Sequence, residues 1–206
     1  LLRGTMRTRA GVAGNTVKFP KIGKGVATLR VPQTDVTPLN VTYGQVTATM
    51  TDYIAAEYSD IFQQSHINFD ERSELVQVVS KSIARRMDQL CIDAMVGNAG
   101  TTVATTVGPG GNTDMNIEKL RAEIDSFMGF KILTMGDRDE GGIPKPSTRN
   151  CFAWHKDAMG YAESMSQKTE VNYVPEKTSY LVSSMFSAGA VTIDADGLIQ
   201  ISCTEA

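Results

Sequence analysis

The first fifty residues alternate apolar and polar side chains with a period of two, which is typical of extended strands. The alternation runs from Val17 to Ile22, resumes from Val26 to Val31, and returns as a β-branched segment from Val41 to Met50. Pro32 and Pro38 interrupt it and exclude a helix or a central strand nearby. We therefore predict two long strands joined by an excursion. Because this ribbon has little large apolar surface, it must lie on another surface, and a neighbouring subunit is one candidate.

After Tyr53 the apolar period becomes helical. A short amphipathic helix of about three turns is predicted to carry one apolar face, made of Ile54, Tyr58, Ile61 and Phe62. A longer helix is predicted from Asp70 to Val96, because Asp70, or Asn68 with Glu71, supplies N-terminal capping chemistry and Gly97 supplies an end. At about 1.5 Å per residue, this helix is a rod of about 40 Å.

Strands dominate the rest of the chain. We predict a loop with one strand over 97–115, a helix over 117–123, an exposed loop over 136–150, and short strands at 130–135, 151–154 and 180–182. A terminal hairpin is predicted from two alternating segments, Ala190–Asp194 and Leu198–Ser202, with Asp196-Gly197 in the turn. Strands on both sides of one long helix indicate an α+β fold.

Charge is distributed unevenly along the chain. The net charge is −3, yet residues 1–34 contain no carboxylate. Such a basic segment is predicted to meet something acidic, either nucleic acid or the body of another copy, although a merely solvated terminus is the alternative. With few aromatic residues nearby, any contact with nucleic acid would be sequence-independent. The candidate cations are Arg3, Arg7, Arg9, Lys18, Lys21, Lys24 and Arg30.

The residues give little sign of catalysis or of a cofactor. His66 is expected to cap a helix and His155 to be a buried, hydrogen-bonding side chain. The acidic residues of 137–140 are expected to form a solvated loop, with Arg138 as a local partner, rather than a metal site. We predict no cofactor, no metal and no enzymatic activity. Three thiols are expected to be buried or half-buried in a reducing cytoplasm, namely Cys91, Cys151 and Cys203.

Membrane and secretory signals are also missing from the pattern. No apolar run reaches about 18 residues, which excludes a bilayer-spanning helix. The basic N-terminus has no apolar block of secretory type behind it, so a signal peptide is not expected.

Several ordered segments resemble the major capsid proteins of tailed bacteriophages, which have the Hong Kong 97-like fold. The resemblance covers almost the whole chain, and four segments carry it: FPKIGKG at 19–25, FDER at 69–72 leading into ARRMDQ at 84–89, FAWHKDAMG at 152–160, and NYVPEKT at 172–178. It implies a subunit that assembles into an icosahedral shell enclosing double-stranded DNA. An encapsulin-like or nucleic-acid-binding shell protein of the same fold is the alternative.

The resemblance also implies a division of the chain. It assigns residues 1–13 to an N-terminal arm, 14–52 to an extended loop over a neighbouring subunit, 53–100 to a peripheral domain with the long helix as its spine, 101–165 to an axial domain, and 166–206 to the returning strands of the peripheral domain. Implied partners are hexamers and pentamers of the chain itself, packaged DNA bound without sequence preference, and scaffolding, portal or decoration proteins. The implied locations are the virion and, during assembly, the host cytoplasm.

One departure from the family pattern falls at Glu123. Family members carry several tens of extra residues before the strand at Phe130, whereas here Glu123 is followed at once by Ile124. We therefore expect a break at this junction, with a Cα separation well beyond the roughly 3.8 Å of a bonded pair. Much of the axial domain would then be absent.

Overall fold

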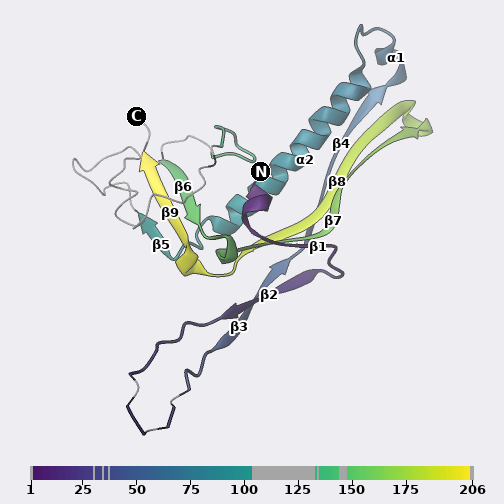
Figure 1. Ribbon diagram of the computed structural model, residues 1–206. Helices are drawn as coiled ribbons and strands as arrows, with labels where there is room; N and C mark the ends of the chain where they lie inside the picture. The colour runs from purple at the N-terminus through teal and green to yellow at the C-terminus, as the bar shows by residue number, and fades with distance from the viewer. Residues whose placement is uncertain are drawn as a thin grey trace.

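The computed structural model describes residues 2–29, 31–33, 35–36, 38–103, 133, 135–143 and 148–204. One long helix, a four-stranded sheet, a three-stranded sheet and a projecting two-stranded ribbon make up this part of the chain (Figure 1). In chain order the elements are η1 (Leu2–Thr5), β1 (Arg7–Ala10), β2 (Thr16–Ile22), β3 (Tyr43–Thr49), β4 (Thr51–Asp60), α1 (Ile61–Gln64), α2 (Glu71–Met95), β5 (Thr101–Val103), β6 (Thr148–Trp154), η2 (Lys156–Ala158), β7 (Met159–Val174), η3 (Pro175–Lys177), β8 (Ser179–Thr192), η4 (Ala195–Gly197) and β9 (Leu198–Thr204).

Helix α2 confirms the predicted long helix almost to its ends. The side chain of Asp70 accepts a hydrogen bond from Ser73 N, and two glutamates in the first turn suit the positive end of the helix dipole. Beyond the last turn, Gly97 has a φ of 74°, a conformation that favours glycine. One stripe of the helix is buried, comprising Val79, Ile83, Cys91, Ile92 and Met95.

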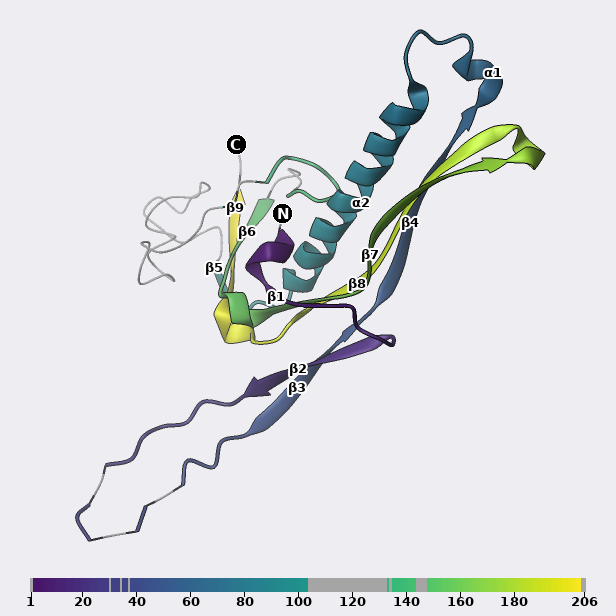
Figure 2. The same ribbon diagram turned by 45° about the vertical axis from the view of Figure 1, so that its right-hand side comes forward.

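The larger sheet has the order β1-β7-β8-β4, and α2 lies along β8 and β4 (Figure 2). Between them, the rings of Tyr53 and Phe186 stack with centroids 5.2 Å apart. At the end of the helix, Thr192 donates a hydrogen bond to the carbonyl of Ala94 at 2.6 Å. The N-terminus joins the same core, because Leu2 and Met6 are buried within it. The main core is therefore built from both ends of the sequence.

The short helix predicted after Tyr53 is wrong over most of its length. Residues 51–60 form β4, which pairs antiparallel with β8 from Thr51↔Ala188 to Asp60↔Ser179, and only α1 is helical. A helical face would have buried Ile54 beside Tyr58, yet Ile54 is 68% exposed. Pairing with β8 along the full length of β4 prevails over the local period, as tertiary context commonly does.

Two strands at the start of the chain are confirmed as β2 and β3, but the first ends at Ile22, and the described residues of the expected continuation at 26–31 are not a strand. Strands β2 and β3 pair antiparallel from Thr16↔Thr49 to Ile22↔Tyr43. The base of this ribbon packs on its own subunit, because Val17, Phe19 and Ala48 form a buried cluster with residues of β7 and of the segment after β8. Beyond Ile22 the chain projects away from the body (Figure 2).

The predicted terminal hairpin is also wrong, although both of its strands exist. Strand β8 pairs with β7 and β4, whereas β9 pairs parallel with β5 and antiparallel with β6 in the second sheet. The turn η4 thus leads the chain from one sheet into another. It is held by distant groups, since Gly100 N donates to Ala195 O and His155 N donates to Gly197 O. Turn chemistry fixed the position of the bend but not the partner strand.

The strands expected at 151–154 and 180–182 and one strand in 97–115 are confirmed as parts of β6, β8 and β5. The helix expected over 117–123 and the 123/124 junction lie outside the described residues, as does most of the strand expected at 130–135. In the part of the chain that the structure describes, no helix is long and apolar enough to cross a membrane.

A substitution at Gly189 would test how closely the ribbon approaches the sheet. A Cβ added there would lie 2.9 Å from the carbonyl carbon of Thr49 and closer still to its oxygen. We expect Gly189→Ala to lower the free energy of unfolding by about 1–3 kcal/mol, because backbone atoms cannot easily give way. Urea unfolding of the unassembled subunit measures this, with Gly4→Ala as the control, since a Cβ at Gly4 meets nothing within 4 Å. Equal stability of the two variants would contradict the packing.

Candidate assembly interface

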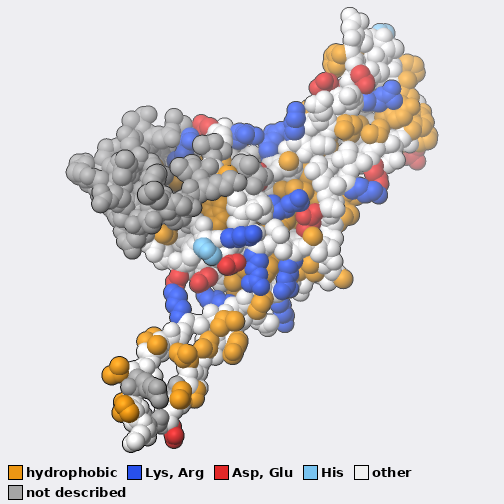
Figure 3. All heavy atoms as spheres, in the orientation of Figure 1, with side chains coloured by type: hydrophobic (Ala, Val, Ile, Leu, Met, Phe, Trp, Pro, Cys, Tyr) orange, Lys and Arg blue, Asp and Glu red, His pale blue; other side chains and the backbone are white. Residues whose placement is uncertain are grey.

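The projecting end of the ribbon exposes an apolar surface. We call residues 22–43 the ribbon tip. Leu29 and Val36 are 93% and 92% exposed, and apolar side chains cover much of this projection (Figure 3). Soluble monomers rarely carry contiguous exposed apolar surface of this kind, and it commonly marks an interaction site. The exposed large apolar residues of the ribbon tip are Ile22, Val26, Leu29, Val31, Val36, Leu39 and Tyr43.

A second exposed apolar group lies at the opposite end of the molecule, around α1 and the far ends of β4 and β7 (Figure 3). Two cations lie over aromatic rings there. Lys177 Nζ is 4.0 Å from the ring centroid of Tyr58, and Arg72 Cζ is 4.6 Å from that of Tyr180. The subunit therefore presents apolar surface at both of its extremities. This distal patch comprises Tyr58, Ile61, Phe62, Phe69, Val171 and Tyr173.

Several cations predicted as an interface contact groups of their own subunit. Arg3 forms an ion pair with Glu163 at 2.9 Å, and that carboxylate is largely buried. Arg9 donates to the carbonyl of Lys18 at 3.3 Å and lies 5.4 Å from the ring centroid of Phe19. These contacts fasten the N-terminal segment to β7 and to the ribbon.

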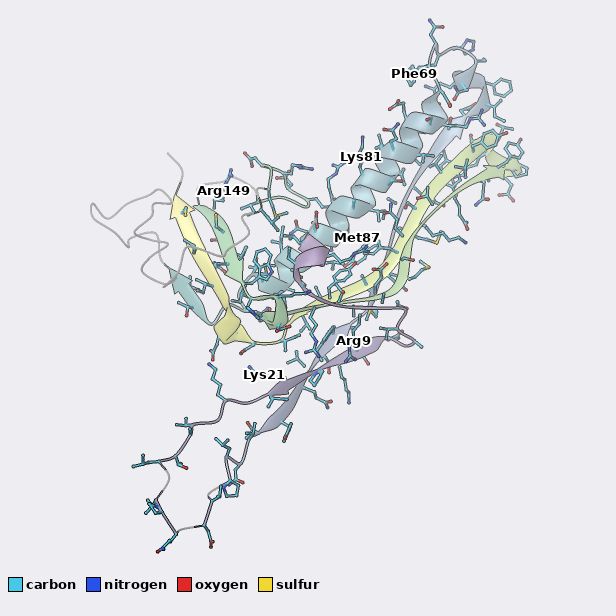
Figure 4. The ribbon with its side chains drawn as sticks, viewed as in Figure 1. Arg9, Lys21, Phe69, Lys81, Met87 and Arg149 are labelled. Atoms are coloured by element: carbon cyan, nitrogen blue, oxygen red, sulfur yellow. The ribbon has the colours of Figure 1, made fainter. Side chains whose placement is uncertain are left out.

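The other two paired cations lie where the ribbon leaves the body of the subunit. Lys21 pairs with Asp194 and Lys24 with Asp196, both at 2.8 Å, so the ribbon is tied to the η4 turn (Figure 4). The hydrogen bond from Lys21 holds the pKa of Asp194 below its ordinary value, and the bond to Asp196 raises the pKa of Lys24. Sequence reasoning missed these acids, because it assigned them to an isolated hairpin turn.

Two predicted cations remain without such a contact. Among the described residues, no ion pair reaches Arg7, which lies on β1, or the exposed Lys18 on β2. Arg30 lies outside the described residues. The structure thus divides the cations of the basic segment into two groups. Some form contacts within the subunit, and others are available to another molecule.

The expectation of a buried His155 is wrong. Its side chain is 74% exposed, and Nδ1 accepts a hydrogen bond from Asp157 N at 3.3 Å, which caps η2. Its position at a cap, rather than inside a sheet, explains the exposure. Among the described residues, no group of three or more His, Cys, Asp or Glu side chains is arranged to hold a metal ion.

The three cysteines are buried or half-buried as predicted, and none of them forms a disulfide. Burial raises the pKa of the Cys91 thiol to about 12, so it stays protonated and behaves as a small apolar group of the core. In the acidic loop, the carboxylate of Asp137 lies 3.9 Å from Arg149, and that of Glu140 lies 3.9 Å from Arg86. Arg138 is therefore not the partner predicted for them.

The fold is similar to that of solved phage heads. The head structure of Helicobacter pylori bacteriophage KHP40 is 10% identical, with a TM-score of 0.71 over 97% of this chain and 87% of that chain. The capsid of Ralstonia phage GP4 is 8% identical, with a TM-score of 0.67 over 98% and 87%. Mycobacterium phage Che8 gives 13% identity and a TM-score of 0.61 over 91% and 84%. The chain therefore has the Hong Kong 97-like capsid fold.

The sequence comparison gives the family itself. A family model described as phage capsid protein matches residues 1–123 and 121–205, and the chain belongs to this family. It is a capsid protein of a bacteriophage, a structural component of the virion. The two matched segments meet at the position where extra family residues were expected. No curated protein matches the chain.

The pairing of Asp194 with Lys21 predicts a specific pH dependence. We expect Asp194→Asn to lower the free energy of unfolding by about 0.5 kcal/mol at neutral pH, because the pair is partly exposed. Since the folded pKa of Asp194 is lowered, its contribution is present above the unfolded value of about 3.9 and is lost as pH falls through the folded value.

Urea unfolding of wild type and variant from pH 7 to pH 3 measures this difference. Asp52→Asn is the control, because no ion pair reaches Asp52 among the described residues. Identical pH profiles for the two variants would contradict the assignment.

Proposed function

We propose that this chain assembles with copies of itself, as hexamers and pentamers, into the closed icosahedral shell that encloses double-stranded DNA. The observation that carries the proposal is the ribbon tip, whose exposed apolar side chains project beyond the subunit's own core. An extended ribbon of this kind gains its burial from a neighbour. Interfaces of permanent assemblies have this apolar character.

The magnitude of that burial is sufficient for assembly. Fully burying one Val, Leu or Ile side chain is worth about 1.5–3 kcal/mol. The ribbon tip exposes six aliphatic side chains of this size, together with Tyr43. Even after the cost of ordering and of lost translational freedom is subtracted, contacts repeated around a shell are favourable. The distal patch offers a second apolar surface for the same purpose.

The division of the chain follows the family resemblance. Residues 1–13 form the arm, 14–52 the extended loop, 53–100 with 166–206 the peripheral domain, and 101–165 the axial domain. The separate sheets support two such bodies, since β4 and β8 share one sheet whereas β5, β6 and β9 share another. Strand β9 thus pairs with β5 and β6, although the division by sequence range assigns it to the returning strands of the peripheral domain. Strand β7 runs from Met159 to Val174, across the boundary at 165/166, with an irregular register between Glu163 and Lys168.

Charge gives the basic segment, residues 1–34, a role in assembly as well. Arg7 and Lys18 are the described cations of the basic segment that are free to contact the acidic surface of an adjacent copy, and we include Arg30 with them. Scaffolding, portal or decoration proteins are the further partners, the host cytoplasm is the site of assembly, and the subunit has no catalytic role.

Assembly is expected to depend on the ribbon tip. We predict that Leu29→Ser with Val36→Ser leaves the subunit folded but raises the concentration needed for shells at least a hundredfold, because burial worth about 3 kcal/mol or more is lost at each contact. Electron microscopy and light scattering measure the shells, and circular dichroism checks the fold. Val78→Ser with Val96→Ser is the control, since both are about half exposed on or beside α2.

Shells at the wild-type concentration from the tip variant would overturn the proposal. Nuclease-protected DNA inside particles produced with the phage distinguishes a genome shell from an encapsulin-like compartment. Particles that never protect DNA would favour that alternative.

Arg7 and Arg3 are expected to respond differently to charge reversal. Arg7→Glu should impair shell formation while the urea midpoint stays unchanged, because no ion pair within the described subunit is lost. Arg3→Glu should lower the free energy of unfolding by about 1–2 kcal/mol, because it leaves the largely buried Glu163 facing another carboxylate. Light scattering and urea unfolding of both variants test this. Normal assembly of Arg7→Glu would remove Arg7 from the interface.

A further inference from the structure

A hollow of about 340 Å³ lies between α2 and the segment 135–141. It is on the side of the helix turned away from the sheet, where the side chain of Lys81 points (Figure 4). Neither the ribbon tip nor the distal patch contributes to it. We call it the α2 groove, and its lining residues are Lys81, Ala84, Arg85, Asp88, Met135, Gly136, Arg138 and Gly141.

Backbone contacts fix the second wall of the α2 groove. Gly141 has a φ of 66°, and a Cβ there would lie 2.7 Å from the carbonyl oxygen of Arg85. Its amide donates to Oε1 of Gln89 at 3.0 Å. This segment therefore rests directly on the helix, so the groove exists before any ligand arrives.

The α2 groove is basic in a chain whose net charge is negative. Its lining contains three cations and a single carboxylate, Asp88, which accepts a hydrogen bond from Leu2 N at 2.9 Å. In the described part of the subunit, no ion pair reaches Lys81, Arg85 or Arg138. Among the described residues, ion pairs therefore leave these three cations of the groove unneutralised.

Two nearby carboxylates are directed elsewhere. Asp137 lies 3.9 Å from Arg149, and Glu140 lies 3.9 Å from Arg86. Neither residue lines the α2 groove. Asp139, the third carboxylate of this loop, is exposed and does not line the α2 groove, and among the described residues no ion pair joins it to Arg138. Arg138 is therefore available to a ligand.

We propose that the α2 groove binds phosphate groups of duplex DNA, and hence that this face of α2 lines the interior of the shell. The inference rests on the proposed function, which places such DNA inside. Guanidinium and ammonium groups suit phosphate oxygens. The lining has no aromatic side chain on which single-stranded bases would stack. The basic arm of another copy cannot occupy it, because residues 1–34 contain no carboxylate.

Binding of a fluorescein-labelled mixed-sequence duplex to unassembled full-length subunits, followed by fluorescence polarisation over a salt series, tests the proposal. The variant is Lys81→Gln with Arg138→Gln. We expect at least a fivefold loss of affinity at low salt. We also expect the slope of log K against log salt to decrease by about 2, since each lost phosphate contact contributes about 0.9.

The matched control is Lys156→Gln with Lys168→Gln, which removes the same charge from exposed positions outside the α2 groove. An equal loss in the control, an unchanged salt slope, or no binding by wild type would overturn the proposal. Preferential displacement of the duplex by polyglutamate would also overturn it, in favour of an acidic protein segment.

Electron microscopy of shells separates this inference from the proposed function. The groove variant is expected to form closed shells at the wild-type concentration. If shells form and DNA binding is unaffected, the inference fails while the capsid role stands. If the variant cannot form shells, the α2 groove is a contact between subunits and the DNA assignment fails.

Discussion

The antiparallel pairing of β7 with β8 holds together the N-terminal segment, the base of the ribbon, β4 and α2. Thirteen register pairs extend from Met159↔Thr192 to Val174↔Ser179. On one edge of this pair lies β1, on the other lies β4, and α2 covers one face through Phe186 and its neighbours. The ribbon base is anchored on the same strands. Without this pairing neither the spine helix nor the ribbon would have a surface to pack on.

The core built on this strand pair leaves the two ends of the subunit exposed. The core ends near Phe19 in one direction, and beyond it ion pairs of Lys21 and Lys24 with the η4 turn hold the ribbon without burying its apolar side chains. Since an isolated two-stranded ribbon is marginal in water, the tip carries apolar side chains that only another molecule can cover. Assembly therefore buries the apolar side chains that folding of the subunit leaves exposed. The same architecture gives the subunit a core of its own and an apolar surface for a neighbour.

Local signals predicted the elements whose stability is local. Asp70, the helical period and Gly97 define α2 because capping and amphipathicity act within a few turns. Strand β4 was misread as a helix because Ile54 and Tyr58 happen to match both periods, and only its distant partner β8 decides between them. The terminal hairpin failed for the same reason: β9 finds its partners in β5 and β6, which the turn cannot specify.

Electrostatic roles were still harder to obtain from sequence. The basic segment is easily recognised from its excess of cations. Three of them, Arg3, Lys21 and Lys24, nevertheless form ion pairs within the subunit, with carboxylates that lie far along the chain. The α2 groove gives no comparable signal, because Lys81 and Arg85 lie on a helix that also carries acids. Only the arrangement of the folded chain shows which charges are neutralised. A basic stretch of sequence can therefore serve either to hold a capsid subunit together or to contact DNA. Cations that form no ion pair within the subunit are the better guide to a DNA contact.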